Sequence, residues 1–139
     1  MEIRRLAEQE AREIHDFFQK EYGQAPWTIE MIEKDLAKDF YYGAYADEGL
    51  CGLIAYQSSD YEEEVNQILV AKSHRRQGLA QRLLAFLDRS KDCFLEVRAS
   101  NVAAQTLYQK MGFLPLATRK DYYHDPVEDA IVMRREKHA

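Results

Sequence analysis

The segment from Asn66 to Ala80 constrains this chain more than any other. The apolar run from Ile68 to Val70 is typical of the end of a strand, and the residues from Leu79 onward are typical of a helix. A loop that leads from a strand into a helix presents unpaired backbone N–H groups, and the helix dipole adds partial positive charge. The spacing therefore indicates a site for a phosphate or pyrophosphate group, or equally an ordinary polar loop with a glycine at the helix start.

The residues of this loop suit a phosphate ligand. Arg75 and Arg76 can donate charge-assisted hydrogen bonds, and Gly78 lacks a Cβ, so the backbone can approach an anion closely. The loop has neither the Gly-Lys-Ser/Thr motif of one common nucleotide site nor the three glycines of the dinucleotide fingerprint. A different class of phosphate-bearing ligand is therefore predicted.

The composition predicts one globular domain covering residues 1–139, because a chain of 139 residues with 46% hydrophobic residues can bury a core. The net charge of −5 argues against nucleic acid as a direct partner. No apolar run has membrane-spanning length, and no apolar segment of a signal peptide follows Arg4 and Arg5. We therefore expect a cytoplasmic protein without a membrane partner, present as a monomer or weak dimer.

The cysteines and histidines do not suggest a metal or redox site. Cys51 and Cys93 lie in apolar, strand-like segments, so we expect both to be buried and unpaired. The histidines are scattered without the spacing of metal ligands, so no metal is expected; they are His15, His74, His124 and His138.

The hydrophobic pattern predicts a mixed α/β chain, with residues 66–98 forming a strand–helix–strand unit. Helices are expected over Glu8–Tyr22, Ile29–Lys38, Leu79–Asp88 and Val102–Met111. Strands are expected over Glu2–Leu6, Phe40–Ala46, Leu50–Ser58, a segment ending at Val70, Cys93–Arg98, Leu116–Tyr123 and Ala130–Arg134.

Two local features have more than one interpretation. The acidic run from Glu62 to Glu64 is interpreted as the solvated end of a hairpin, with a rim that attracts a basic peptide as the alternative. Trp27, beside a turn, is expected to plug the core, although its loop could also form part of a substrate wall.

Two side chains are candidates for proton transfer. Glu96 is a carboxylate inside an apolar strand, where burial would raise its pKa and suit a general base, but it could equally form a structural ion pair with Arg98. Tyr108 lies on the following helix, and a phenol with an ordinary pKa of about 10 carries a proton at neutral pH. On an apolar helix face, a tyrosine is also a common core residue.

The pattern Arg75-x-x-Gly78-x-Ala80 resembles the signature with which GCN5-related N-acetyltransferases (GNATs) hold the pyrophosphate of acetyl-coenzyme A. Further segments resemble the RimI-type ribosomal-protein-alanine N-acetyltransferases of that family, and the resemblance covers nearly the whole chain. These segments are 25–27, 95–104, 107–113, 119–123 and 127–130. The connection between Gly78 and Cys93 is shorter than is usual in the family.

The resemblance implies a GNAT fold, with a central mixed, mostly antiparallel β-sheet and helices on both faces. It implies an acetyl-coenzyme A-dependent enzyme that acetylates the N-terminal alanine of a small-subunit ribosomal protein, with Glu96 as general base and Tyr108 as general acid. The implied cofactor-binding residues are Ile68, Leu69, Val70, Arg75, Arg76, Gln77, Gly78, Leu79, Ala80, Gln81 and Asn101. Alternatives are a GNAT that acts on a small-molecule amine or on other N-termini, and a non-catalytic acetyl-coenzyme A-binding domain.

Overall fold

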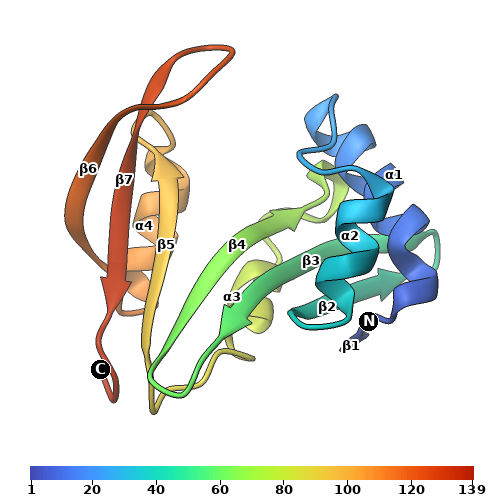
Figure 1. Cartoon of the computed structure of the whole chain (residues 1–139), viewed down its shortest axis with the longest axis horizontal. Coiled ribbons are helices and arrows are strands. Elements are labelled where there is room, and N and C mark those ends of the chain that lie inside the picture. The colour runs from blue at the N-terminus through green and yellow to red at the C-terminus, as the bar shows by residue number, and fades with distance from the viewer. The chain divides into compact units, whose positions relative to one another are not determined.

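The computed structural model describes all 139 residues and divides into two compact units (Figure 1). The first unit contains residues 1–57 and 67–86, and the second contains residues 58–66 and 87–139. The strands follow the order β1-β2-β3-β4-β5-β7-β6, and β4 (Glu62–Val70) contributes residues to both units. The pair formed by β4 and β5 (Asp92–Arg98) is parallel, whereas β1–β2, β2–β3, β5–β7 and β6–β7 are antiparallel. The expected mixed, mostly antiparallel sheet is confirmed.

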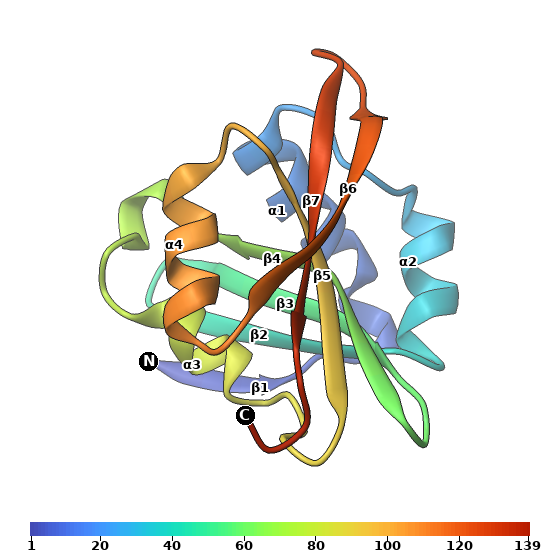
Figure 2. The same ribbon diagram turned by 90° about the vertical axis from the view of Figure 1, so that its left-hand side faces the viewer.

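The first unit has helices on both faces of its strands (Figure 2). Its strands are β1 (Glu2–Arg5), β2 (Phe40–Ala46), β3 (Gly49–Ser58) and the end of β4; its helices are η1 (Glu8–Glu10), α1 (Ala11–Tyr22), α2 (Ile29–Leu36), η2 (Lys72–His74) and α3 (Leu79–Leu84). Neighbouring side chains of β2 point to opposite faces. Tyr41 packs against Trp27 at a ring-centroid distance of 6.3 Å, whereas Tyr42 stacks on Phe86 at 4.2 Å.

Both helices predicted in the N-terminal half are present, but Glu8–Glu10 forms the 3-10 turn η1 before α1, and α2 ends two residues before the predicted Lys38. The predicted apolar face of α1 is buried. Gly23 ends this helix with φ +82°, and the Thr28 side chain caps α2 by accepting a hydrogen bond from the Met31 N–H at 3.2 Å. Trp27 packs edge-on against Phe18 at 5.6 Å but stays half-buried, so it covers the edge of the core and does not plug it as expected.

The helix predicted from Leu79 to Asp88 is wrong in length, because α3 ends at Leu84. The N–H of Phe86 bonds to the carbonyl of Leu83, three residues earlier, which tightens the chain into a turn. This turn carries the ring of Phe86, which stacks on Tyr42. The apolar spacing of the leucines is compatible with either conformation, so the sequence pattern overestimated the helix.

The second unit carries α4 (Val102–Lys110) on one face of its strands, as Figures 1 and 2 both show. Its strands are the start of β4, then β5, β7 (Glu128–Arg135) and β6 (Leu114–Tyr123). Strands β6 and β7 each begin two residues earlier than predicted. Along β5 the buried residues alternate with half-buried ones, so Phe94 and Glu96 lie on the face opposite to Leu95 and Val97.

Both cysteines are buried and unpaired, as expected. Burial raises the pKa of the Cys51 thiol, and it raises the pKa of the Cys93 thiol to about 12. None of the helices has the length and apolar character needed to cross a bilayer.

Candidate functional site

The loop between β4 and α3, in the first unit, presents exposed backbone. Arg76 and Gly78 both have left-handed conformations, with φ +64° and +75°. The first hydrogen bond into α3 runs from the Arg82 N–H to the Gly78 carbonyl at 3.2 Å, so the N–H groups of the first helical residues have no partner within the helix. A Cβ built on Gly78 would meet no atom within 4 Å, which leaves space beside the backbone for a ligand.

The first half of this loop is anchored, and its second half is open. The N–H of Ala71 donates to the Cys51 carbonyl at 2.9 Å, and the Lys72 N–H donates to the Glu21 carboxylate at 3.0 Å. The side chain of Arg75 folds back and donates to the Val70 carbonyl at 3.2 Å. Arg76, like Gln77 and Gly78, is exposed, so the free donors lie at the helix end of the loop.

Glu96 lies on β5 in the second unit, with a side chain that is 19% exposed. Its Oε2 atom is 3.2 Å from Nε of Arg119, but the geometry makes no hydrogen bond, and this buried oxygen has no hydrogen-bond partner. The alternative pairing with Arg98 is wrong, because Arg98 forms its ion pair with Glu128 at 3.2 Å. The ion-pair partner of Glu96 is instead Arg119, which lies on a different strand of the sheet, β6.

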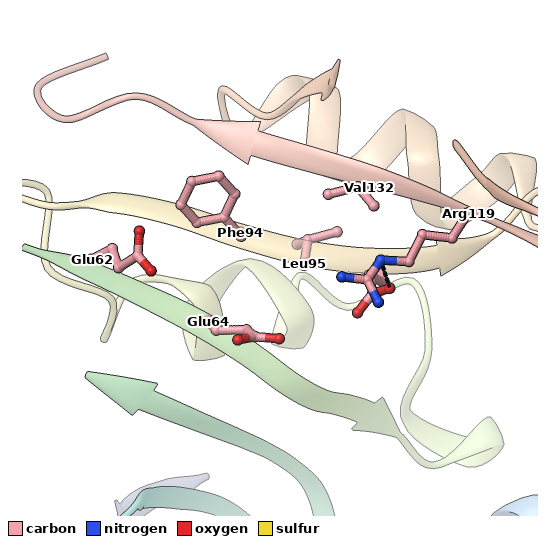
Figure 3. A pocket seen from close by; sticks show the side chains of 7 residues that line it. Glu62, Glu64, Phe94, Leu95, Arg119 and Val132 are labelled. Carbon is pink, nitrogen blue, oxygen red and sulfur yellow. Dashed lines mark ion pairs between the residues drawn. The ribbon is translucent and has the colours of Figure 1, made fainter. Parts of the chain in front are cut away.

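A pocket of about 190 Å³ opens beside Glu96, entirely within the second unit (Figure 3). Carboxylates from β4 and β5 and the guanidinium of Arg119 form its polar wall. The lining residues are Glu62, Glu64, Phe94, Leu95, Glu96, Arg119 and Val132. Three acids and one base give the wall an excess of negative charge, which favours a cationic group such as an ammonium.

The interpretation of Glu62 to Glu64 as a solvated hairpin end is confirmed for Glu62 and Glu64, which are exposed, and is wrong for Glu63, which is buried. These residues belong to β4 and pair with β5, so their side chains alternate between faces. Glu63 is buried and accepts a hydrogen bond from the Asp88 N–H at 2.6 Å, whereas Glu62 and Glu64 are exposed and line the pocket. The turn that precedes them is centred on Ser59, which accepts from the Glu62 N–H at 3.2 Å.

Tyr122 and Arg119 are neighbours of Glu96 that the sequence did not identify. The guanidinium of Arg119 lies 5.4 Å from the centre of the Tyr122 ring. Burial, followed by the negative charge of Glu96, raises the pKa of the Tyr122 phenol. Both residues fall within the segment 119–123 that carries the family resemblance, and that is the one sequence signal that points to them.

Tyr108 and Asn101 both lie at α4. Tyr108 is 7% exposed, and its ring meets Phe113 edge-on at a centroid distance of 6.1 Å. Asn101 is the N-cap, and its side chain accepts from the Ala104 N–H at 3.1 Å. The loop residues 75–81 therefore belong to the first unit, and Glu96, Asn101 and Tyr108 belong to the second.

The comparisons with known proteins identify the family. Residues 37–115 match the family described as acetyltransferase (GNAT) domain. The chain belongs to the GNAT acetyltransferases.

Individual relatives show which members of the family this GNAT acetyltransferase is similar to. It is 33% identical over 123 residues to the N-alpha-acetyltransferase RimI of Mycobacterium tuberculosis, an alignment that covers 82% of this chain and 78% of that protein. An uncharacterized Mycobacterium leprae protein is 34% identical over 123 residues, and the alignment covers 82% of this chain but only 34% of that protein's length. The crystal structure of the ribosomal-protein-S18-alanine N-acetyltransferase from Escherichia coli superposes with a TM-score of 0.87 at 26% identity, covering 99% of this chain and 94% of that one.

Glu128 connects the start of α4 in this GNAT acetyltransferase to β7. Its carboxylate accepts from the Ser100 N–H at 2.6 Å and pairs with Arg98 at 3.2 Å. Hydrogen bonding from Ser100, with a further contribution from Arg98, lowers the pKa of Glu128 below its ordinary value of 4.5. The carboxylate thus stabilises the junction that positions Asn101 and the helix of Tyr108.

We expect the variant Glu128→Gln to destabilise the fold more at pH 7 than at pH 3, because the stabilising charge is progressively lost as the pH falls below the ordinary pKa. A lowered folded-state pKa contributes stability above the unfolded pKa, and that stability is lost as the pH falls through the folded value. Urea unfolding of the unaltered protein and the variant at both pH values measures this difference. An equal difference at pH 7 and pH 3 would show that the charge of Glu128 is not what stabilises the junction.

Proposed function

We propose that this protein is an acetyl-coenzyme A-dependent N-terminal acetyltransferase that acts on the N-terminal alanine of a small-subunit ribosomal protein. The observation that carries the proposal is Glu96, a carboxylate with a buried oxygen that accepts no hydrogen bond, in a pocket with excess negative charge. The RimI name of a relative aligned over 82% of this chain supports N-terminal amines as acceptors, and the name of the Escherichia coli structure supports a ribosomal alanine.

We propose that the loop between β4 and α3 binds acetyl-coenzyme A. Its open space beside Gly78 and its exposed donors fit a pyrophosphate, and the arginines add positive charge. Backbone groups at the end of β4 would hold the pantetheine and the thioester carbonyl. The proposed residues are Ile68, Leu69, Val70, Arg75, Arg76, Gln77, Gly78, Leu79, Ala80 and Gln81, together with Asn101.

The proposed mechanism is direct transfer. An N-terminal amine with a pKa of about 8 is mostly protonated at pH 7, so Glu96 first accepts a proton from it, directly or through water. The free amine nitrogen then bonds to the acetyl carbonyl carbon as the carbon–sulfur bond breaks. Tyr108 donates its proton to the departing thiolate, the new amide nitrogen releases its second proton to water, and Tyr108 regains a proton from water. No residue of the protein becomes acetylated.

We further propose that residues 1–139 form a single N-acetyltransferase domain, which the Escherichia coli superposition over 99% of the chain supports. The proposed setting is the cytoplasm, with the enzyme as a monomer or weak dimer. Alternative acceptors are small-molecule amines and other N-termini, and a domain that binds acetyl-coenzyme A without turnover is the non-catalytic alternative. Retention of both Glu96 and Tyr108 favours catalysis.

The variant Tyr108→Phe should reduce kcat by about tenfold or more, because it removes the proposed proton donor, whereas acetyl-coenzyme A should still bind. The ring keeps its shape, so the contact with Phe113 should be retained. Steady-state kinetics and isothermal titration with acetyl-coenzyme A measure the two quantities. Unchanged kcat would exclude Tyr108 as the acid, and lost cofactor binding would assign it to packing or binding.

A panel of acceptors tests the proposed function. It contains a short peptide with an Ala-Arg N-terminus, peptides with other N-termini, an N-terminally blocked copy with an internal lysine, and a polyamine. We expect selective acetylation of the free alanine N-terminus, measured by mass spectrometry. Acetylation of the polyamine or the lysine alone would overturn the acceptor, and binding without any turnover would support the non-catalytic alternative.

A further inference from the structure

We propose that Arg119 is a displaceable counter-charge of Glu96 in the transfer reaction. It pairs with the carboxylate of Glu96 while the acceptor is absent, and the ammonium of the acceptor takes its place. This inference rests on the proposed function, in which Glu96 receives the proton of the amine.

The geometry of the pair leaves the carboxylate ready for another donor. Nε of Arg119 is 3.2 Å from Oε2 of Glu96, yet that oxygen is buried and accepts no hydrogen bond. A buried acceptor without a hydrogen bond is unfavourable, and an ammonium carries three N–H donors that can be oriented toward it. The acceptor can therefore offer Glu96 a hydrogen bond that Arg119 does not make.

Arg119 is also held weakly. Its side chain is 60% exposed, and it lies on the exposed strand β6, with the ring of Tyr122 as a neighbouring contact. Ion pairs with one exposed partner contribute little to stability, because water competes for the charge. Displacing the guanidinium of Arg119 from Glu96 should therefore cost little free energy.

The charges of the pocket allow one cation to replace another. Arg119 is the one basic side chain among the residues that line the pocket. Glu62 and Glu64 add two carboxylates from β4, and Figure 3 shows this strand beside β5. When the ammonium pairs with Glu96, the released guanidinium has these carboxylates or water as partners. Glu96 thus never loses its counter-charge before proton transfer.

The exchange also matches the chemistry of a base. While the pair is intact, Nε of Arg119 lies 3.2 Å from the buried Oε2 atom of Glu96 and occupies the place that a proton donor needs. The acceptor can reach this oxygen and transfer its proton only once Arg119 has moved away. The pair with Arg119 therefore belongs to the enzyme before acceptor binding, and it competes with the acceptor.

Kinetics of three variants test this competition. Arg119→Gln should lower the KM of an alanine-starting peptide about two- to fivefold without lowering kcat, because a weak competing ion pair is lost. Arg119→Lys should retain a KM close to that of the unaltered protein. Lys120→Gln, which removes one charge from the next, exposed position of β6, is the matched control and should change neither constant.

A raised KM or a lowered kcat in Arg119→Gln would mean that Arg119 binds the acceptor or supports Glu96 directly, and an unchanged KM would mean that it does not compete. Each of these results overturns the inference while the proposed function stands. Absence of transfer to any N-terminus by the unaltered protein would overturn the proposed function together with the inference.

Nuclear magnetic resonance gives a readout that does not depend on turnover. The Nε–Hε signal of Arg119 is assigned by its absence in Arg119→Lys, and the ¹⁵N-labelled protein is titrated with the peptide in the presence of coenzyme A. We expect the Arg119 signal to shift with the free peptide and to stay in place with its N-terminally blocked copy. An unmoved signal at a peptide concentration that saturates the enzyme would overturn the exchange.

Discussion

The variant Glu96→Gln should lower kcat at pH 7 by about 10²- to 10³-fold, since positioned general bases contribute that order of rate. The loss should shrink several-fold at pH 9. The reason is that the unprotonated fraction of an N-terminal amine rises from about a tenth at pH 7 to about nine tenths at pH 9. The rate of transfer therefore depends less on a general base at the higher pH. Initial rates at saturating peptide, measured from pH 6.5 to 9.5, give both quantities.

Two controls make the Glu96 result interpretable. Glu136→Gln removes an equal charge from an exposed residue beyond the end of β7 and should leave the pH profile unchanged. Circular dichroism and acetyl-coenzyme A binding of Glu96→Gln should match those of the unaltered protein. A loss of the same size at every pH, in a folded variant, would contradict a base and indicate a binding or structural role.

The variant Gly78→Ala should weaken acetyl-coenzyme A binding by about tenfold or more. Gly78 has φ +75°, and a Cβ there meets no protein atom within 4 Å, so the free protein has room for the methyl group. A pyrophosphate held against this backbone would be the group that the methyl displaces. Isothermal titration with acetyl-coenzyme A measures the change in Kd.

Gly23→Ala is a matched control for the backbone strain of Gly78→Ala. Gly23 has φ +82°, and a Cβ added to it would likewise meet no atom within 4 Å, but this glycine ends α1 and is outside the proposed loop. Each substitution should reduce the free energy of unfolding by about 1–2 kcal/mol, the usual strain of an L-residue in this region. Equal losses of cofactor affinity in the two variants would contradict the phosphate-binding role of Gly78.

Local signals explain what the sequence could predict. The caps at Gly23 and Thr28 and the loop glycine Gly78 act over a few residues, so their residue types reveal the conformation. The same holds for the apolar run of β5, which located Glu96 on a strand. The motif around Gly78 also led to the correct family.

Partners across the sheet could not be predicted in this way. Arg98 was a plausible partner for Glu96 because it lies two residues along the same strand, but the neighbour is Arg119 from β6. Strand order and register decide such a contact, and they depend on packing over the whole unit. The burial of Glu63 beside exposed Glu64 has the same origin, because it follows from the pairing of β4 with β5.

The buried thiols have a practical consequence for measuring this reaction. With a pKa of about 12, Cys93 has only about one thiolate per ten thousand molecules at pH 8. Cys51 is likewise buried, with a raised pKa. The protein should therefore react slowly with disulfide dyes, and a colorimetric reagent for free thiols should report the coenzyme A that is released at each turnover with little background from the enzyme.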